Sequence, residues 1–308
     1  MLKPSQYPIQ KGVNPTVYHS SKYERGDARK TISNSSLCKF MESPFEWINQ
    51  KEEVSTGAMQ HGSLVDCLLF TPDCYETLYS IVPETYPAKG SRKDDPPIDK
   101  PWTTKATYCQ EWEDGVRAQG KTPIKSVDLN TANCAIRRLN ERPVIRELLE
   151  SSDFQVCVSA DWHDEVTGLV VPIKCLIDIV PHGKSFLADL KTARSLNRRD
   201  YNRSFFDNGY ASQCALYLDA YNIATNESRN EFRHIISKNS SPFECAARYV
   251  SDEFIQIGRT FYRHALALYC QCLGNNNWPG IDEFQPSREA IGGWDVIQPE
   301  AWMMWASL

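Results

Sequence analysis

Alternating apolar and polar residues predict a group of β-strands in the second half of the chain. In FQVCVSADWH (154–163) every second residue is apolar, the period of a strand with one buried face. DEVTG then predicts a turn, and the apolar segments LVVPIKCLIDIV (169–180) and KSFLADLKT (184–192) predict two more strands. Two short strands are predicted within 232–237 and 244–250.

Helical periodicity is found on both sides of these strands. Ser33, Ser35 and Ser36 precede an apolar periodicity, which predicts a capped helix start. GAMQHGSLVDCLLF (57–70) places its apolar residues and His61 at helical spacing. Further helices are predicted near 103–119, 129–150, 200–224 and 252–273. This order predicts an α/β fold with a mixed central β-sheet flanked by helices and a helical N-terminal portion.

The length is compatible with a single domain over 1–308. Within it we distinguish an N-terminal extension (1–30), a loop with five prolines (83–106) and a Trp-rich tail (276–308). Long loops in compact domains are often functional or disordered, and the sequence assigns this one no role.

Composition narrows the class of protein only a little. The net charge is −5 and 41% of the residues are apolar, so any contact with nucleic acid needs a local concentration of basic residues. The start of the chain does not read as a leader, and apolar runs fall short of the roughly 18 residues of a membrane span. The eleven cysteines are not grouped as cluster ligands. We therefore expect a cytoplasmic protein with reduced thiols, no membrane contact and no iron–sulfur cluster.

The third predicted strand carries an unusual pair of charges, Asp189 and Lys191, which share one face because they are two residues apart. If PHGKS is a hairpin turn, Asp178 on the preceding strand can converge on Asp189. Two close carboxylates repel each other, and a divalent cation between them removes that penalty; hard oxygen ligands suit magnesium or manganese. Lys191 can then orient a water or stabilise charge on a phosphate. A salt-bridged strand edge is the plainer alternative.

Four motifs together resemble a known family. Asp178 followed by Asp189-Leu190-Lys191 resembles the signature of PD-(D/E)XK nucleases. GAMQH (57–61) resembles the Gly-x-x-x-His helix, and QCALY (213–217) the Gln-x-x-x-Tyr motif, of their RecB and RecE exonuclease branch. SNSSLCKFMESPFEW (33–47) resembles the opening of RecE-like phage and prophage exonucleases. The resemblance implies a restriction-endonuclease-like core.

The same resemblance implies roles for individual residues. The metal, Mg²⁺ with Mn²⁺ as a substitute, would be held by His61, Asp178, Asp189 and the backbone carbonyl of Leu190. Lys191 would position the attacking water, and Gln213 and Tyr217 would line the DNA path or brace the site. Gln155 stands near a position where related enzymes often carry an extra glutamate on the first strand, so this sequence departs from the family pattern there.

Basic residues follow the predicted active-site strand directly. They are Arg194, Arg198, Arg199 and Arg203. Because arginine suits bidentate phosphate contacts, we expect this run to bind DNA, with a solvated surface as the alternative. Ser35 and Ser36 are primarily candidates for the helix N-cap. By analogy with lambda-type exonucleases, a secondary role of Ser35 is contact with the DNA 5′ phosphate.

As a whole, the resemblance implies a Mg²⁺-dependent exodeoxyribonuclease that degrades linear double-stranded DNA from 5′ to 3′ during recombination or phage DNA processing. It also implies a homo-oligomeric ring around DNA and a RecT-like single-strand annealing protein as partner. The alternatives are an endonuclease or single-strand nuclease of the same fold, and a non-catalytic DNA-binding assembly subunit.

Overall fold

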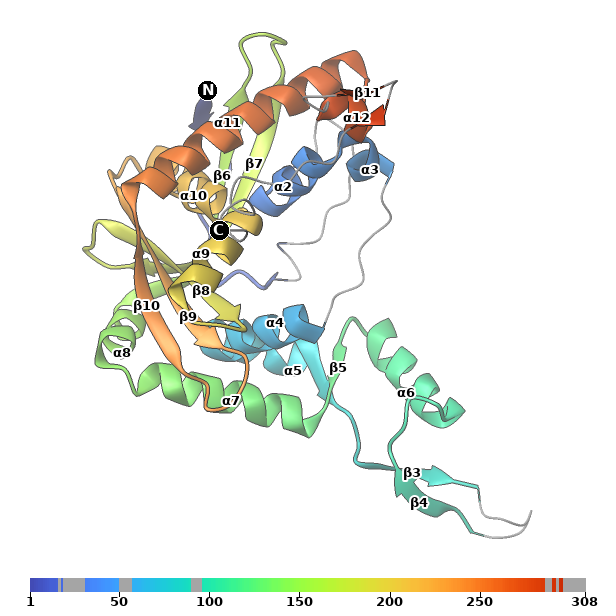
Figure 1. Cartoon of the computed structure of the whole chain (residues 1–308). Coiled ribbons are helices and arrows are strands. Elements are labelled where there is room, and N and C mark those ends of the chain that lie inside the picture. Colours follow the sequence, from blue (N-terminus) through green and yellow to red (C-terminus); the bar gives the residue numbers. More distant parts are fainter. Residues whose placement is uncertain are drawn as a thin grey trace, which may run out of the picture.

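A mixed sheet of six strands lies at the centre of the molecule (Figure 1). The computed structural model describes residues 1–15, 18, 31–49, 57–89 and 96–285, and the backbone of 290–291 and 294–295. In spatial order the strands are β1 (Leu2–Pro4), β6 (Ser152–His163), β7 (Val170–Pro181), β8 (Phe186–Ala193), β9 (Glu231–Lys238) and β10 (Cys245–Val250). β8 and β9 run parallel, and the other neighbours pair antiparallel.

The alternation seen in the sequence is what builds these strands. Val156, Val158 and Ala160 of β6 are at most 1% exposed, while the residues between them are partly exposed. β6 and β7 pair along almost their whole length and are joined by the predicted turn. The five predicted strands are therefore confirmed.

Helices cover both faces of the sheet (Figure 1). One core packs the sheet against α2 (Asn34–Glu42), α10 (Tyr210–Thr225) and α11 (Asp252–Asn275). The other packs it against α4 (Gly57–Phe70), α7 (Ser126–Asn140) and α8 (Pro143–Glu150). Successive residues of β8 alternate between the two, Leu187 belonging to the first core and Ala188 and Leu190 to the second. Asp189 and Lys191 follow the side of Leu187, toward α10.

The remaining elements are short or lie at the edge. They are α3 (Pro44–Asn49), η1 (Pro72–Cys74), α5 (Tyr75–Leu78), β2 (Tyr79–Ile81), β3 (Thr85–Ala88), β4 (Ile98–Pro101), α6 (Thr107–Ala118), β5 (Thr122–Ile124), α9 (Arg198–Asp207), α12 (Ile281–Phe284), β11 (Ala290–Ile291) and β12 (Trp294–Asp295). β3 and β4 form a hairpin that projects from the body beside α6 (Figure 1).

Three sequence predictions need correction. The segment 83–106 is not simply a loop, because it contains the β3–β4 hairpin. The predicted helix 129–150 is two helices, since Pro143 starts α8 at the position where a missing N–H is harmless. The predicted helix 200–224 breaks between α9 and α10 at Gly209, whose φ of 66° favours glycine and whose Cβ would lie 2.4 Å from Cys38 Sγ.

The predicted fold class, a mixed α/β sheet flanked by helices with a helical N-terminal portion, is confirmed. Much of the extension 1–30 and of the tail 276–308 lies outside the described residues. Within the described ranges, no helix combines the length and apolar character needed to cross a bilayer.

Candidate active site

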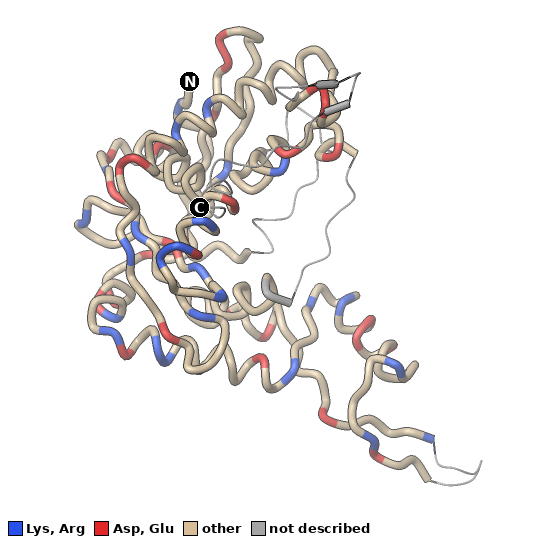
Figure 2. Tube along the Cα trace, viewed as in Figure 1, with Lys and Arg blue, Asp and Glu red and all other residues tan. Residues whose placement is uncertain are grey.

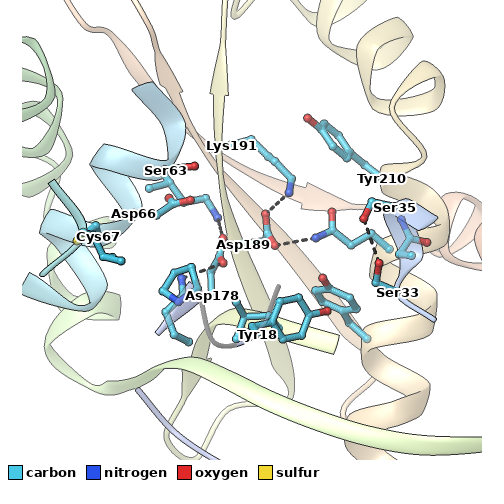
Figure 3. A pocket seen from close by; sticks show the side chains of 18 of the residues that line it. Tyr18, Ser33, Ser35, Ser63, Asp66, Cys67, Asp178, Asp189, Lys191 and Tyr210 are labelled. Carbon is cyan, nitrogen blue, oxygen red and sulfur yellow. Dashed lines mark hydrogen bonds and ion pairs between the residues drawn. The ribbon is translucent and has the colours of Figure 1, made fainter. Parts of the chain in front are cut away.

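A cavity of about 730 Å³ opens where the sheet meets α2, α4 and α10 (Figure 3). It is lined mainly by polar side chains, including Tyr18, Ser33, Asn34, Ser35, Ser63, Asp66, Gln155, Asp178, Asp189, Lys191, Asn208, Tyr210, Gln213 and Tyr217. Segments from residue 18 to residue 217 therefore meet at one place. Such a convergence of polar groups in a concave site is typical of a binding or catalytic site.

The β7–β8 hairpin brings the two predicted aspartates into this cavity. β7 and β8 pair at Ile179 and Ala188, and Asp178 and Asp189 are the next residues on their strands. The backbone N–H of Leu190 donates to Asp178 Oδ2 at 2.9 Å. The two carboxyl groups thus face the same space, as the hairpin in the sequence suggested.

Lys191 completes this group from the same strand as Asp189. Its Nζ lies 2.5 Å from Asp189 Oδ2, and it also lies over the ring of Tyr210, 4.6 Å from the ring centroid (Figure 3). Burial by itself lowers the pKa of Lys191, but the carboxylate of Asp189, helped by Tyr210 and Asp178, raises it above its ordinary value. Lys191 is therefore a charged ammonium beside a carboxylate that is only 1% exposed.

A third acid enters the cavity from α4. Burial, and then the charge of Asp189, raise the pKa of Asp66 to about 7, against the opposing effect of Lys191. Burial raises the pKa of Asp178 well above its usual range, and Asp189 and Asp66 add to that rise. Among the described residues that line the cavity, three carboxyl groups thus lie beside one lysine ammonium.

This donor set fits a hard divalent cation. Among the described residues no three His, Cys, Asp or Glu side chains already stand in metal-binding geometry. The acids are nevertheless oxygen donors that repel one another, and a cation would relieve that repulsion. Gln155 Oε1 is a further oxygen at this cavity, buried and without a hydrogen-bond partner in the described part of the chain.

His61, the predicted ligand from α4, is not among the residues that line the cavity. Burial lowers its pKa, with Asp128 opposing, and its Nε2 is buried with no hydrogen-bond partner among the residues described. Five residues separate His61 from Asp66, about 140° around a helix, so the two side chains point in different directions. Asp66 is the acid that α4 directs to the cavity.

A signal for Asp66 was present in the sequence. Gly62-Ser-Leu-Val-Asp66 repeats the spacing of Gly57 to His61, with an acid at the last position. A Cβ at Gly62 would lie 3.2 Å from Thr192 Oγ1, so this glycine lets α4 approach β8 closely. The spacing alone could not decide between the two registers.

The Gln-x-x-x-Tyr motif lies on α10 and faces the cavity. Gln213 Nε2 donates to Asp189 Oδ1 at 3.1 Å, and Tyr217 lines the cavity one turn later. Tyr210 lies on the same face of α10, and its spacing of three from Gln213 was overlooked in the sequence. One face of α10 therefore contacts both Asp189 and Lys191.

A second cavity of about 740 Å³ adjoins the first. The two share Ser63, Asp66, Asn208 and Tyr210 as lining residues. Of the four predicted DNA-binding arginines, Arg194 lines this second cavity. The other three, Arg198, Arg199 and Arg203, lie on α9 and line neither cavity. Figure 2 shows lysines and arginines gathered around α9 and the adjoining strands, although the chain as a whole is acidic.

Of the serines at the start of α2, one caps the helix and another is exposed in the cavity. Ser33 is the N-cap, its side chain accepting from the N–H of Ser36, so the cap is neither Ser35 nor Ser36. Ser35 Oγ lies 3.1 Å from Ser33 Oγ, and both serines line the first cavity (Figure 3). Ser35 is thus exposed to whatever enters there.

The chain is similar to known proteins in sequence and in fold. A family model described as "PDDEXK-like domain of unknown function (DUF3799)" matches residues 33–284. The crystal structure of a "Putative exonuclease" from Eubacterium rectale matches with a TM-score of 0.55 and 15% identity, covering 96% of this chain and 98% of that one. The crystal structure of SSO0001 matches with a TM-score of 0.30 and 15% identity, covering 52% and 68%. No curated protein matches the sequence.

Proposed function

Since the chain belongs to the PDDEXK-like domain family DUF3799, we propose that it is a nuclease that hydrolyses DNA phosphodiester bonds with a divalent cation. The resemblance to PD-(D/E)XK nucleases is confirmed by that membership, while the RecE-like branch stays a prediction. The observation that carries the proposal is the meeting of Asp178, Asp189 and Lys191 in one polar cavity.

Asp66, Asp178, Asp189 and the Leu190 carbonyl are the groups that would hold the cation. When bound, Mg²⁺ or Mn²⁺ would supply an activated water and neutralise charge on the phosphoryl oxygens. The ligand from α4 would be Asp66 rather than His61, because Asp66 lines the cavity.

Lys191 would act on the reacting atoms directly. Its ammonium, held between Asp189 and the ring of Tyr210, would orient the attacking water or stabilise charge that develops on the phosphate. Gln213 would keep Asp189 in place through its hydrogen bond to Oδ1, while Tyr217 lines the path of the DNA.

DNA would cross the two adjoining cavities, with the scissile phosphate at their junction. Arg194 would contact phosphate in the second cavity. The positive electrostatic potential that attracts DNA would be increased by the arginines of α9, Arg198, Arg199 and Arg203. Ser35 would contact a terminal 5′ phosphate in the first cavity. This local basic surface offsets the net charge of −5.

In its finer form the proposal is a 5′→3′ exonuclease on linear duplex DNA. It would work as a homo-oligomeric ring, and a RecT-like annealing protein would receive the 3′ single strand. Ring closure would account for processive digestion, because an enzyme held around DNA need not rebind after each step.

Digestion of linear duplexes labelled separately at the 5′ and 3′ ends, with magnesium and with EDTA, tests both levels of the proposal. We expect magnesium-dependent loss of the 5′ label as mononucleotide, and no cleavage of a covalently closed circle. Cleavage of the circle would establish an endonuclease instead. Absence of any cleavage with either Mg²⁺ or Mn²⁺ would refute the nuclease assignment.

A further inference from the structure

Gln155 has an unusual backbone conformation inside a strand. Its φ is 46°, in the left-handed region that side-chain-bearing residues rarely adopt. Asn226 and Asn276 also have positive φ, but they end helices, where such a conformation is common. Gln155 interrupts β6 in the middle of its pairing with β7.

The interruption lies directly opposite a site residue. Phe154 pairs with Ile179 and Val156 pairs with Ile177, so the register places Gln155 across from Asp178. The carbonyl of Gln155 instead accepts from the N–H of Val13 at 3.1 Å. The N-terminal segment therefore stabilises the distorted backbone from outside the β6–β7 ladder.

The distortion brings the amide of Gln155 to the carboxyl of Asp178. The side chain is 2% exposed, and its Nε2 donates to Asp178 Oδ1 at 3.2 Å. Leu190 N–H donates to the other oxygen, Oδ2, so both oxygens of Asp178 are held. Gln155 thus donates a side-chain amide hydrogen bond to Asp178, as Gln213 does to Asp189.

The oxygen of the same amide has no hydrogen-bond partner among the described residues. Gln155 Oε1 is buried at the cavity without a hydrogen bond from any described residue. A buried acceptor without a donor is unfavourable unless a bound group satisfies it. A cation, or a water on that cation, would do so.

We propose that Gln155 is a positioning residue of the metal site. Its amide N–H holds Asp178 for cation binding, and its amide oxygen would accept a hydrogen bond from a water bound to the cation. This inference rests on the proposed nuclease function. A neutral amide suits the position because it donates to Asp178 without adding a fourth negative charge to Asp66, Asp178 and Asp189. Strained backbone conformations are commonly retained where they serve a site.

Two variants separate this role from a purely structural one. Gln155→Met keeps the side-chain length and removes the hydrogen bond. Gln155→Asn keeps the amide but is too short to reach Asp178, and asparagine tolerates positive φ better than glutamine. A structural role in the strand would be preserved by Gln155→Asn, whereas the positioning role would be lost. Gln110→Met on α6 is the matched control, since it also removes a glutamine hydrogen bond, from Nε2 to Thr104 O.

The measurement is Mn²⁺ binding to the full-length chain by calorimetry, with thermal unfolding in EDTA. We expect both Gln155 variants to bind Mn²⁺ about 10- to 100-fold more weakly, as for other residues that orient metal ligands, and the metal-free melting temperatures to stay close to wild type. Gln110→Met should bind as wild type does. Wild-type affinity in a folded Gln155→Met or Gln155→Asn protein would overturn the inference. Absence of Mn²⁺ binding by the wild-type chain would overturn the metal-dependent function as well.

Discussion

Helices α10 and α11 pack so closely at Gly258 that the loss of stability in Gly258→Ala can be worked out from interatomic distances. A Cβ built on Gly258 of α11 would lie 1.9 Å from the carbonyl oxygen and 2.2 Å from the carbonyl carbon of Ala211 on α10. Real Cβ atoms do not come within 3.0 Å of such atoms. In Gly258→Ala the two helices must therefore separate by about 1 Å or more, because backbone atoms cannot rotate aside as side chains do.

The expected loss of stability combines two opposing effects. Overpacking of this kind costs about 3 kcal/mol, the upper end of the usual range, because backbone meets backbone. Alanine in a helix interior returns about 1 kcal/mol relative to glycine. The net loss is about 2 kcal/mol, roughly a 30-fold change in the folding equilibrium. For a chain of this length we expect the melting temperature to fall by about 3 °C.

Denaturant unfolding followed by circular dichroism measures this loss, and α11 offers its own control. A Cβ on Gly274 would be 3.6 Å from Leu169 Cδ1, an ordinary contact, so Gly274→Ala should be neutral or slightly stabilising. Because Ala211 lies between Tyr210 and Gln213, Gly258→Ala should also lower nuclease activity while Gly274→Ala does not. A Gly258→Ala protein as stable as wild type would show that the packing argument is wrong.

Four further predictions concern the site. Lys191→Ala should lower cleavage about 100-fold or more while retaining binding to duplex ends, and wild-type digestion would refute its role. Asp66→Ala should weaken Mn²⁺ binding more than His61→Ala, and the reverse order in calorimetry would restore His61 as the ligand. Without metal, the free energy of unfolding should fall as the pH rises from about 4 to 7. Burial raises the pKa of Asp66 to about 7, so over this range the folded state keeps a proton that the unfolded state loses. Chemical denaturation at a series of pH values measures the fall, which should be smaller for Asp66→Asn. DNA affinity should drop steeply with salt, and a binding constant independent of salt in fluorescence anisotropy would exclude the basic surface as its source.

The strands and the two aspartates could be predicted because the information is local. Alternation predicted the buried residues Val156, Val158, Ala160 and Trp162 but not Gln155, and the short turn before β8 made an antiparallel hairpin the simplest arrangement. Residues at matching positions on the two strands of a hairpin lie side by side. Asp178 and Asp189 could therefore be placed together without knowledge of the rest of the fold.

The contribution of α4 could not be predicted in the same way. His61 and Asp66 both follow a glycine by four residues, and periodicity does not tell which side of an isolated helix faces a distant strand. That choice depends on how α4 rotates as its apolar residues pack against β8 and α7. The break at Gly209 was missed for a related reason, since a helical pattern continues across it.

The sequence by itself determined the alternating strands, the amphipathic helices and the acidic pair with its lysine, because each depends on contacts between near neighbours in the chain. Only the tertiary structure decided that Asp66 reaches the cavity, that Tyr210 packs against Lys191 and that Gln155 lies opposite Asp178. These contacts join residues far apart along the chain. Their geometry is set by the packing of both cores against the sheet, which depends on the whole set of buried side chains at once.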